Sequence, residues 1–174
     1  YIQWVVTIFM FIFGVNFNFY YFLLMRKFKQ ALGMEEVRWF CFIVLSAVAV
    51  ITANIYDPVH GFSASVRDSA FQVSSIITTT GYATANFDAW PQLSRTILVV
   101  LMFIGACAGS TGGGMKISRL LIYVKKASRE LRTLARPNLV QTSRMDGKRL
   151  EENVEQGALL FLVCYVLVFF GRSE

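Results

Sequence analysis

The sequence predicts an all-α membrane protein in which two membrane helices flank a re-entrant segment and the second of these helices is broken. Hydrophobic residues make up 55% of the 174 residues and charged residues only 16%, whereas about 25% of the residues in a typical soluble domain are charged. The charged residues cluster between long charge-free runs, and one uncharged segment is too polar to cross a bilayer. These three observations place the chain in the membrane class.

Four charge-free runs are close to the length that a membrane helix requires, which is about 20 mostly apolar residues. The runs are Tyr1–Met25, Trp39–Tyr56, Thr96–Met115 and Gln156–Gly171. The last run is the shortest and is borderline. No basic segment precedes the first run, which is also too long for the apolar part of a signal peptide. We therefore expect the chain to begin at or inside a helix and to be a fragment of a longer membrane protein.

The basic residues predict the orientation of these runs, because cytoplasmic connections are rich in Lys and Arg. Four basic residues lie in 26–38 and ten lie in 116–149, whereas Asp57–Arg95 holds only two. We therefore expect the first two connections to face the cytoplasm and Asp57–Arg95 to begin and end outside.

Asp57–Arg95 is predicted to enter the bilayer and return on the same side. Ser65–Asp68 resembles a helix N-cap, with an acid near the positive end of the helix. A helix over 66–78 is about 20 Å long at 1.5 Å per residue, so it reaches only the middle of the bilayer. Trp90-Pro91 favours the membrane interface and a new helix start. The chain between them must return as an extended segment.

The returning segment begins in the uncharged run SSIITTTGYATA, Ser74–Ala85. Non-helical backbone at membrane depth is tolerated only where it is buried in protein or lines a water-filled path. Its carbonyls can then replace the water around a cation. Gly81 can adopt the backbone angles that direct successive carbonyls to one side, and we expect the Tyr82 ring to brace the segment from behind. The alternative is a solvated threonine-rich loop.

A glycine-rich break is predicted inside the next helix. As one helix, Pro91–Val124 would be about 51 Å long, well beyond the ~30 Å hydrocarbon core. Each glycine inside a helix costs about 1 kcal/mol relative to alanine, so Gly112–Gly114 favour an unwound loop after a first half at Pro91–Ile104. Broken helices at this depth commonly mark transport sites.

Two details of this break have alternative interpretations. Gly105 and Gly109 match the spacing of a close helix-packing motif, so they are also compatible with an intact helix that packs tightly on a neighbour. Lys116 follows the glycines directly, at a depth where a lysine needs water or a partner. It either contacts the loop or extends to the inner interface.

The residues Thr79-Thr80-Gly81-Tyr82-Ala83 resemble a degenerate form of the T-V-G-Y-G filter of potassium channels. They depart from it at Thr80, which stands for Val, and at Ala83, which stands for the last Gly. Such single-glycine filters are typical of the Trk/Ktr/HKT superfamily of potassium transporters. A second resemblance lies in GACAGSTGGGMK, Gly105–Lys116, which is similar to an intramembrane gating loop in the TrkH-like members.

The resemblance implies a potassium-channel-like helix–pore-loop–helix repeat, the third of four in one chain. Potassium would bind at the backbone carbonyls of Thr79, Thr80, Gly81 and Tyr82. The gate would consist of Gly109, Ser110, Thr111, Gly112, Gly113, Gly114 and Lys116. The implied elements are a closing helix of the preceding repeat at 1–25, a complete repeat at 39–125, a basic cytoplasmic connection at 126–154 and the first helix of the following repeat at 155–174. Within the repeat lie an outer helix (39–56), a pore helix (66–78), a filter (79–84) and a broken helix (91–125).

By the same resemblance the intact protein takes up potassium and is a multi-pass protein of the bacterial inner membrane. Its implied partners are the potassium ion, the lipid bilayer, a second copy in a homodimer, and a cytosolic nucleotide-binding subunit of the TrkA-like kind. The basic stretch 116–149 either docks that subunit or faces anionic lipid headgroups. No cofactor and no nucleic acid is expected, and coupling to sodium or protons is left open.

Other functions are compatible with parts of the sequence. A secondary transporter of another solute would place its site at the two broken segments, and a tetrameric cation channel would use the same repeat once per subunit. No enzyme is predicted, because the sequence has no H-E-x-x-H or G-x-S-x-G motif. The three cysteines lie in apolar runs and are expected to be packing residues. Asp146-Gly147 predicts a short hairpin within Val140–Glu151.

Overall fold

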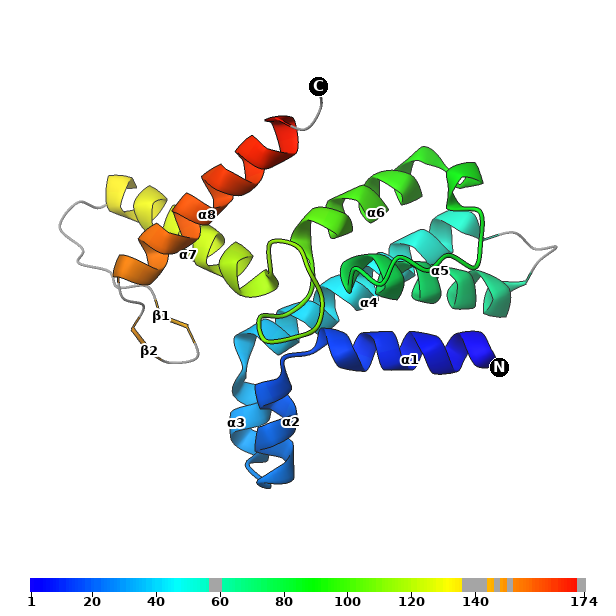
Figure 1. Cartoon of the computed structure of the whole chain (residues 1–174), viewed down its shortest axis with the longest axis horizontal. Coiled ribbons are helices and arrows are strands. Elements are labelled where there is room, and N and C mark those ends of the chain that lie inside the picture. The colour runs from blue at the N-terminus through cyan, green and yellow to red at the C-terminus, as the bar shows by residue number, and fades with distance from the viewer. Residues whose placement is uncertain (57–60, 136–143, 146–147, 150–151, 172–174) are drawn as a thin grey trace. The chain divides into compact units, whose positions relative to one another are not determined.

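The structure is a computed structural model that describes residues 1–56, 61–135, 144–145, 148–149 and 152–171. The chain forms two units, residues 1–117 and 118–174. The first contains α1 (Ile2–Gly14), α2 (Phe17–Leu24), α3 (Phe28–Gly33), α4 (Glu35–Ile55), α5 (Phe62–Ile77), the short 3₁₀ helix η1 (Phe87–Ala89) and α6 (Gln92–Ile104) (Figure 1). α7 (Ile117–Ala135) begins at the boundary and continues in the second unit, which also contains β1 (Arg144–Met145), β2 (Lys148–Arg149) and α8 (Glu152–Gly171).

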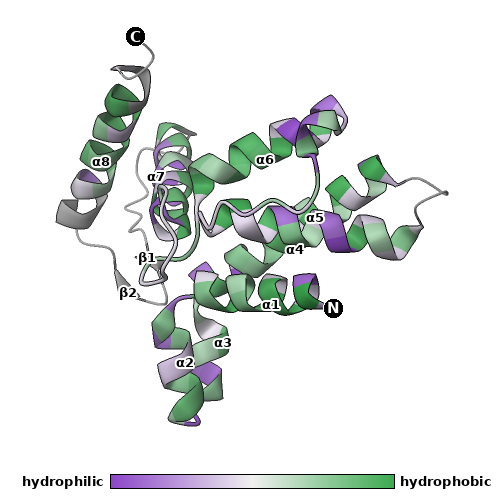
Figure 2. Cartoon of the chain, turned by 45° about the vertical axis from the view of Figure 1, so that its right-hand side comes forward, coloured by the Kyte–Doolittle hydropathy of each residue, from purple (hydrophilic) through white to green (hydrophobic). Residues whose placement is uncertain are grey.

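α4 is the outer helix that the sequence predicts. Within the described ranges it is the one helix that is long and apolar enough to cross a bilayer alone. It begins at Glu35 rather than at Trp39, because two acids occupy its first turn, where free N–H groups and the helix dipole favour negative charge. Large apolar side chains such as Leu45 remain exposed on it, and α4 and α6 are coloured largely hydrophobic in Figure 2. Such surfaces suit lipid or further parts of a membrane protein.

The prediction of one continuous helix over Tyr1–Met25 is wrong. The run forms α1 and α2, which meet at an angle of 90°. Val15 adopts an extended conformation, and the Asn16 side chain accepts a hydrogen bond from the Asn18 N–H at 2.9 Å, which caps α2. The sequence N-F-N-F, Asn16–Phe19, therefore starts a new helix inside an apolar run.

α5 is the pore helix of the prediction, and it packs against α1, α4 and α6. Figure 1 shows it alongside these helices. The hydroxyls of Thr52 on α4 and Ser69 on α5 form a buried hydrogen bond of 2.6 Å. Asn54 on α4 donates to Ser94 on α6 at 2.8 Å. Hydrogen bonds between small polar side chains are a common means of joining membrane helices.

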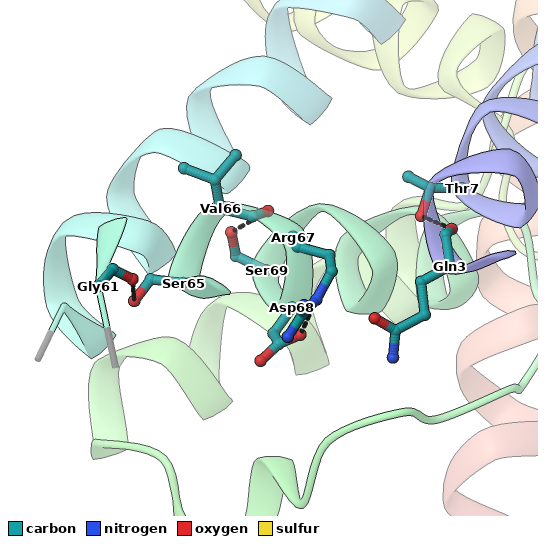
Figure 3. A network of polar contacts seen from close by, with 8 residues as sticks. All are labelled: Gln3, Thr7, Gly61, Ser65, Val66, Arg67, Asp68 and Ser69. Atoms are coloured by element: carbon teal, nitrogen blue, oxygen red, sulfur yellow. Dashed lines mark hydrogen bonds and ion pairs between the residues drawn. The ribbon is translucent and has the colours of Figure 1, made fainter. Parts of the chain in front are cut away.

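The predicted start of the pore helix is wrong by about a turn. α5 begins at Phe62 after Gly61, which has a φ of +78° and provides no side-chain cap. Ser65 is already inside the helix, and its hydroxyl donates to the Gly61 carbonyl at 3.4 Å (Figure 3). Asp68 forms an ion pair with its neighbour Arg67 at 3.0 Å instead of capping the helix.

The broken second helix is confirmed. α6 ends at Ile104, Gly105 takes a φ of +71°, and α7 begins only at Ile117. The first half therefore lies close to the predicted Pro91–Ile104. The second half extends to Ala135 rather than to residue 125; Pro137, predicted to end it, lies outside the described residues.

The second unit is held by contacts between α7 and α8. The Tyr123 hydroxyl donates to the Ala158 carbonyl at 2.6 Å, and the Arg119 guanidinium lies 3.9 Å from the centre of the Phe161 ring. α7 carries both hydrophobic and hydrophilic residues (Figure 2). β1 and β2 pair antiparallel within the predicted hairpin, and the turn Asp146-Gly147 itself lies outside the described residues.

Candidate functional site

The pore helix ends in a tight left-handed turn. The Thr78 N–H donates to the Ser74 carbonyl at 3.2 Å, and the Thr80 N–H donates to the Ser75 carbonyl at 2.9 Å. Thr79 between them has a φ of +57°, which is uncommon for a residue branched at Cβ. The helix thus stops at Thr78 and the chain reverses into the predicted filter segment, Thr79–Ala83.

The predicted filter segment is exposed in this chain, and its backbone is fixed at both ends. Gly81 has a φ of +79°, a conformation that glycine adopts without strain. The Ser75 hydroxyl donates to the Tyr82 carbonyl at 2.6 Å, which ties the returning chain to the pore helix. The Tyr82 carbonyl is therefore directed at Ser75. No described residue donates a hydrogen bond to the carbonyls of Thr79, Thr80 or Gly81.

The expectation that the Tyr82 ring braces this segment from behind is wrong within this chain. The ring is 67% exposed and lies beside two grooves. The larger groove has a volume of about 570 Å³ and lies between the filter segment, α5 and α6. The bracing comes instead from Ser75, which is buried on α5 and holds the backbone rather than a side chain.

The twelve-residue loop between α6 and α7, Gly105–Lys116, is named here the glycine loop. Three of its glycines have left-handed φ angles: Gly105 (+71°), Gly109 (+67°) and Gly114 (+79°). A Cβ atom on Gly105 would lie 2.5 Å from the Gly113 carbonyl oxygen. The alternative that Gly105 and Gly109 pack an intact helix is therefore wrong, because both are in the loop and Gly105 packs against the loop itself.

The glycine loop directly contacts the start of the filter segment. The Gly113 N–H donates to the Thr79 hydroxyl oxygen at 2.7 Å, and that hydroxyl donates to the Thr78 carbonyl at 2.7 Å. A Cβ atom on Gly112 would lie 3.2 Å from the Thr78 carbonyl oxygen, so the two backbones approach closely. The Lys116 ammonium donates to the Gly112 carbonyl. Of the two interpretations of Lys116, the one observed is contact with the loop.

The other side of the glycine loop pairs with the bend between α1 and α2. The Cys107 N–H donates to the Gly14 carbonyl at 3.2 Å, and the Phe17 N–H donates to the Gly109 carbonyl at 3.1 Å. The Thr111 N–H donates to the Phe13 carbonyl at 3.4 Å. Backbone groups that an unbroken first helix would have used internally are therefore used by the loop.

Glu36 is a site residue that the sequence reasoning missed. It lies in the first turn of α4 and is 3% exposed. One carboxylate oxygen accepts from the Ala108 N–H at 2.5 Å, and the other accepts from the Asn16 side-chain amide at 3.1 Å. The outer helix predicted over 39–56 begins after this acid, so Glu36 was given no role. Its position immediately before a membrane helix was the available signal.

The fold and the site together define a class, the pore-loop membrane proteins. A pore helix packs between membrane helices, an exposed non-helical segment returns from its end, and a broken helix places a glycine loop against that segment. The chain belongs to the TrkH family, described as cation transport protein, whose family model matches residues 1–173.

Known relatives give the same result. The chain is 34% identical to the Trk system potassium uptake protein TrkH of Salmonella typhimurium, in an alignment covering 97% of this chain and 35% of that protein. It is 31% identical to TrkG of Escherichia coli over 89% of this chain and 33% of that protein. The crystal structure of the potassium transporter TrkH from Vibrio parahaemolyticus matches with a TM-score of 0.86 and 31% identity, covering 97% of this chain and 37% of that one. This chain thus spans about a third of the length of these relatives.

Proposed function

We propose that this chain forms one wall of a potassium pathway in a longer uptake protein. Thr79, Thr80 and Gly81 contribute backbone carbonyl oxygens that replace part of the water around the ion. The observation that carries this proposal is that these three carbonyls accept no hydrogen bond from the described residues, although the backbone around them is fixed by Ser75.

Charge and position also support a cation pathway. The C-terminal end of α5 points its partial negative charge toward the filter segment, which favours a cation there. The segment is exposed in this chain, as expected for a wall that other repeats complete. Tyr82 contributes less than the sequence suggested, because its carbonyl already accepts from Ser75. The ion is potassium in the relatives by their names.

We also propose that the glycine loop is the gate of this pathway. It contacts Thr79 through the Gly113 N–H. It has no regular secondary structure and is held by backbone hydrogen bonds to other segments. A segment of this kind can move without unfolding a helix. Within it, Gly112 and Gly113 lie against Thr78 and Thr79, and Lys116 donates to the Gly112 carbonyl. We assign the gate to Gly109–Gly114 with Lys116.

The intact protein is proposed to lie in the bacterial inner membrane, to form a homodimer and to bind a cytosolic nucleotide-binding subunit. The support for the last point is charge. α7 carries five basic residues between Arg119 and Arg132 and one acid, so it offers a cationic surface on the side of the chain predicted to face the cytoplasm. No cofactor is proposed, and potassium is the substrate.

Replacing Gly81 tests the filter proposal. Gly81→Ser places a side chain on a residue with a φ of +79°, which costs about 1–2 kcal/mol and shifts the neighbouring carbonyls. In the full-length protein, the ratio of potassium to sodium flux into proteoliposomes should fall. Gly33→Ser is the matched control, because a Cβ atom there meets nothing within 4 Å. An unchanged flux ratio in Gly81→Ser would remove the filter assignment.

A further inference from the structure

A buried acid fixes the glycine loop at a point away from the filter segment. The Glu36 carboxylate holds two chain segments at once, through the Ala108 N–H at 2.5 Å and the Asn16 amide at 3.1 Å. Ala108 lies in the glycine loop and Asn16 in the α1–α2 bend. Hydrogen bonds to a charged acceptor are stronger than those to a neutral one, so this carboxylate is suited to hold a loop that has no helix to support it.

The orientation of Asn16 is set independently of Glu36. Its side-chain oxygen accepts from the Asn18 N–H at 2.9 Å and thereby caps α2. Its amide nitrogen is consequently the atom that faces Glu36. The same side chain lies against the loop, since a Cβ atom on Gly109 would be 3.3 Å from the Asn16 oxygen.

We propose that Glu36 is a positioning residue that holds the glycine loop in its closed place, with Asn16 as the partner that orients it. The inference rests on the proposed role of the loop as a gate. It identifies the residue to which the gate is attached, the acid Glu36 at the start of the outer helix. This acid accepts hydrogen bonds from two other segments. Release of the loop then requires that the Ala108 N–H leave this carboxylate.

The donors and acceptors of this cluster predict a specific pattern of variants. In Glu36→Gln the side chain keeps its shape but has only one oxygen. Whichever way the amide turns, its NH₂ faces either the Ala108 N–H or the Asn16 NH₂, both of which are donors. In Asn16→Asp two carboxylates face each other. Each single variant therefore weakens the attachment of the loop.

The double variant Asn16→Asp with Glu36→Gln restores the match. The glutamine oxygen accepts from Ala108, and its NH₂ donates to one oxygen of the new aspartate. The other aspartate oxygen still accepts from the Asn18 N–H and caps α2. If the two residues mattered only for folding, attachment of the loop would not recover in the double variant, because it contains both damaging changes.

The experiment measures loop placement and flux separately in the full-length protein. Cys107 precedes Ala108 in the glycine loop and is fully buried. With the other cysteines of the protein replaced, its rate of modification by a thiol reagent reports release of the loop. Loss of one buried, charge-assisted hydrogen bond predicts a rate increase of about tenfold or more in each single variant. The double variant should return to within a few-fold of the parent.

Ungated potassium flux into proteoliposomes, normalised to the amount of folded protein, should follow the same order with an unchanged potassium to sodium ratio. Glu35→Gln removes the same charge one residue earlier and is the matched control. Unchanged labelling of Cys107 in Glu36→Gln, or a double variant labelled as fast as the singles, overturns the inference. Faster labelling without faster flux retains the attachment but removes the proposed role of the loop as a gate.

Discussion

The tightest point of the glycine loop gives the sharpest prediction. Gly105 ends α6 with a φ of +71°, and a Cβ atom there would lie 2.5 Å from the Gly113 carbonyl oxygen and 3.1 Å from the Gly114 Cα. Real Cβ atoms essentially never approach another heavy atom closer than 3.0 Å. Both obstructing atoms belong to the backbone, so they can move only if the loop itself moves.

The free-energy cost of Gly105→Ala to the observed loop conformation has two contributions. The backbone of Gly105, with a φ of 71° and a ψ of −170°, lies in a region that is essentially restricted to glycine and costs other residues about 1–3 kcal/mol. The contact with Gly113 adds to this cost. A cost of one or two kcal/mol changes a two-state ratio by about 5–30-fold. The ratio of the observed loop conformation to its alternatives therefore falls by at least this factor. We expect ungated potassium flux through the full-length protein to rise by a similar factor.

The assay compares three glycines in the full-length protein. Gly105→Ala should have the largest effect. Gly109→Ala should have a smaller one, because it shares the left-handed φ but its Cβ atom meets a side-chain oxygen at 3.3 Å. Gly33→Ala, in α3, should have none, since nothing lies within 4 Å. Ungated flux is measured in proteoliposomes at equal amounts of protein. Equal flux in all three variants would refute the reasoning that links this loop geometry to gating.

Two further predictions concern the contacts around the filter segment. Thr79→Val removes the oxygen that accepts from the Gly113 N–H, so we expect higher ungated flux. Thr79→Ser keeps this oxygen and should behave more like the parent. Identical flux in the two variants would count against this contact. Gly14→Ala would place a Cβ atom 2.8 Å from the Thr78 side chain and 2.9 Å from the Phe40 ring. We therefore expect a lower thermal unfolding midpoint in detergent. A midpoint equal to that of Gly33→Ala would show that α1 does not pack on α5 in this way.

Local features of the sequence were enough to predict much of the repeat. Gly112–Gly114 make a continuous helix costly wherever they lie, so the break after Ile104 could be predicted without knowledge of the surroundings. The end of the pore helix at Thr78 could also be predicted locally, because the uncharged polar run that follows favours a non-helical return. The role of the filter segment remains a prediction, because it depends on carbonyl directions and on repeats that this chain does not contain.

The features that sequence reasoning missed depend on partners that are distant in the chain. The bend at Asn16 is stabilised by the Cys107 N–H and by the Gly109 carbonyl, which no window around residue 16 contains. Glu36 was given no role because its donor Ala108 is likewise distant in sequence. Ser65 was misplaced for the opposite reason: its local pattern fits a cap, but the helix already begins after Gly61.

The central claim is that the carbonyls of Thr79, Thr80 and Gly81 bind the transported ion. The most direct test is the anomalous scattering of crystals of the full-length protein grown with rubidium or thallium ions in place of potassium. The account predicts density for an ion bounded by these three carbonyls, with the Tyr82 carbonyl still bonded to Ser75. Density at another level of the pathway with none beside Thr79–Gly81 would contradict it.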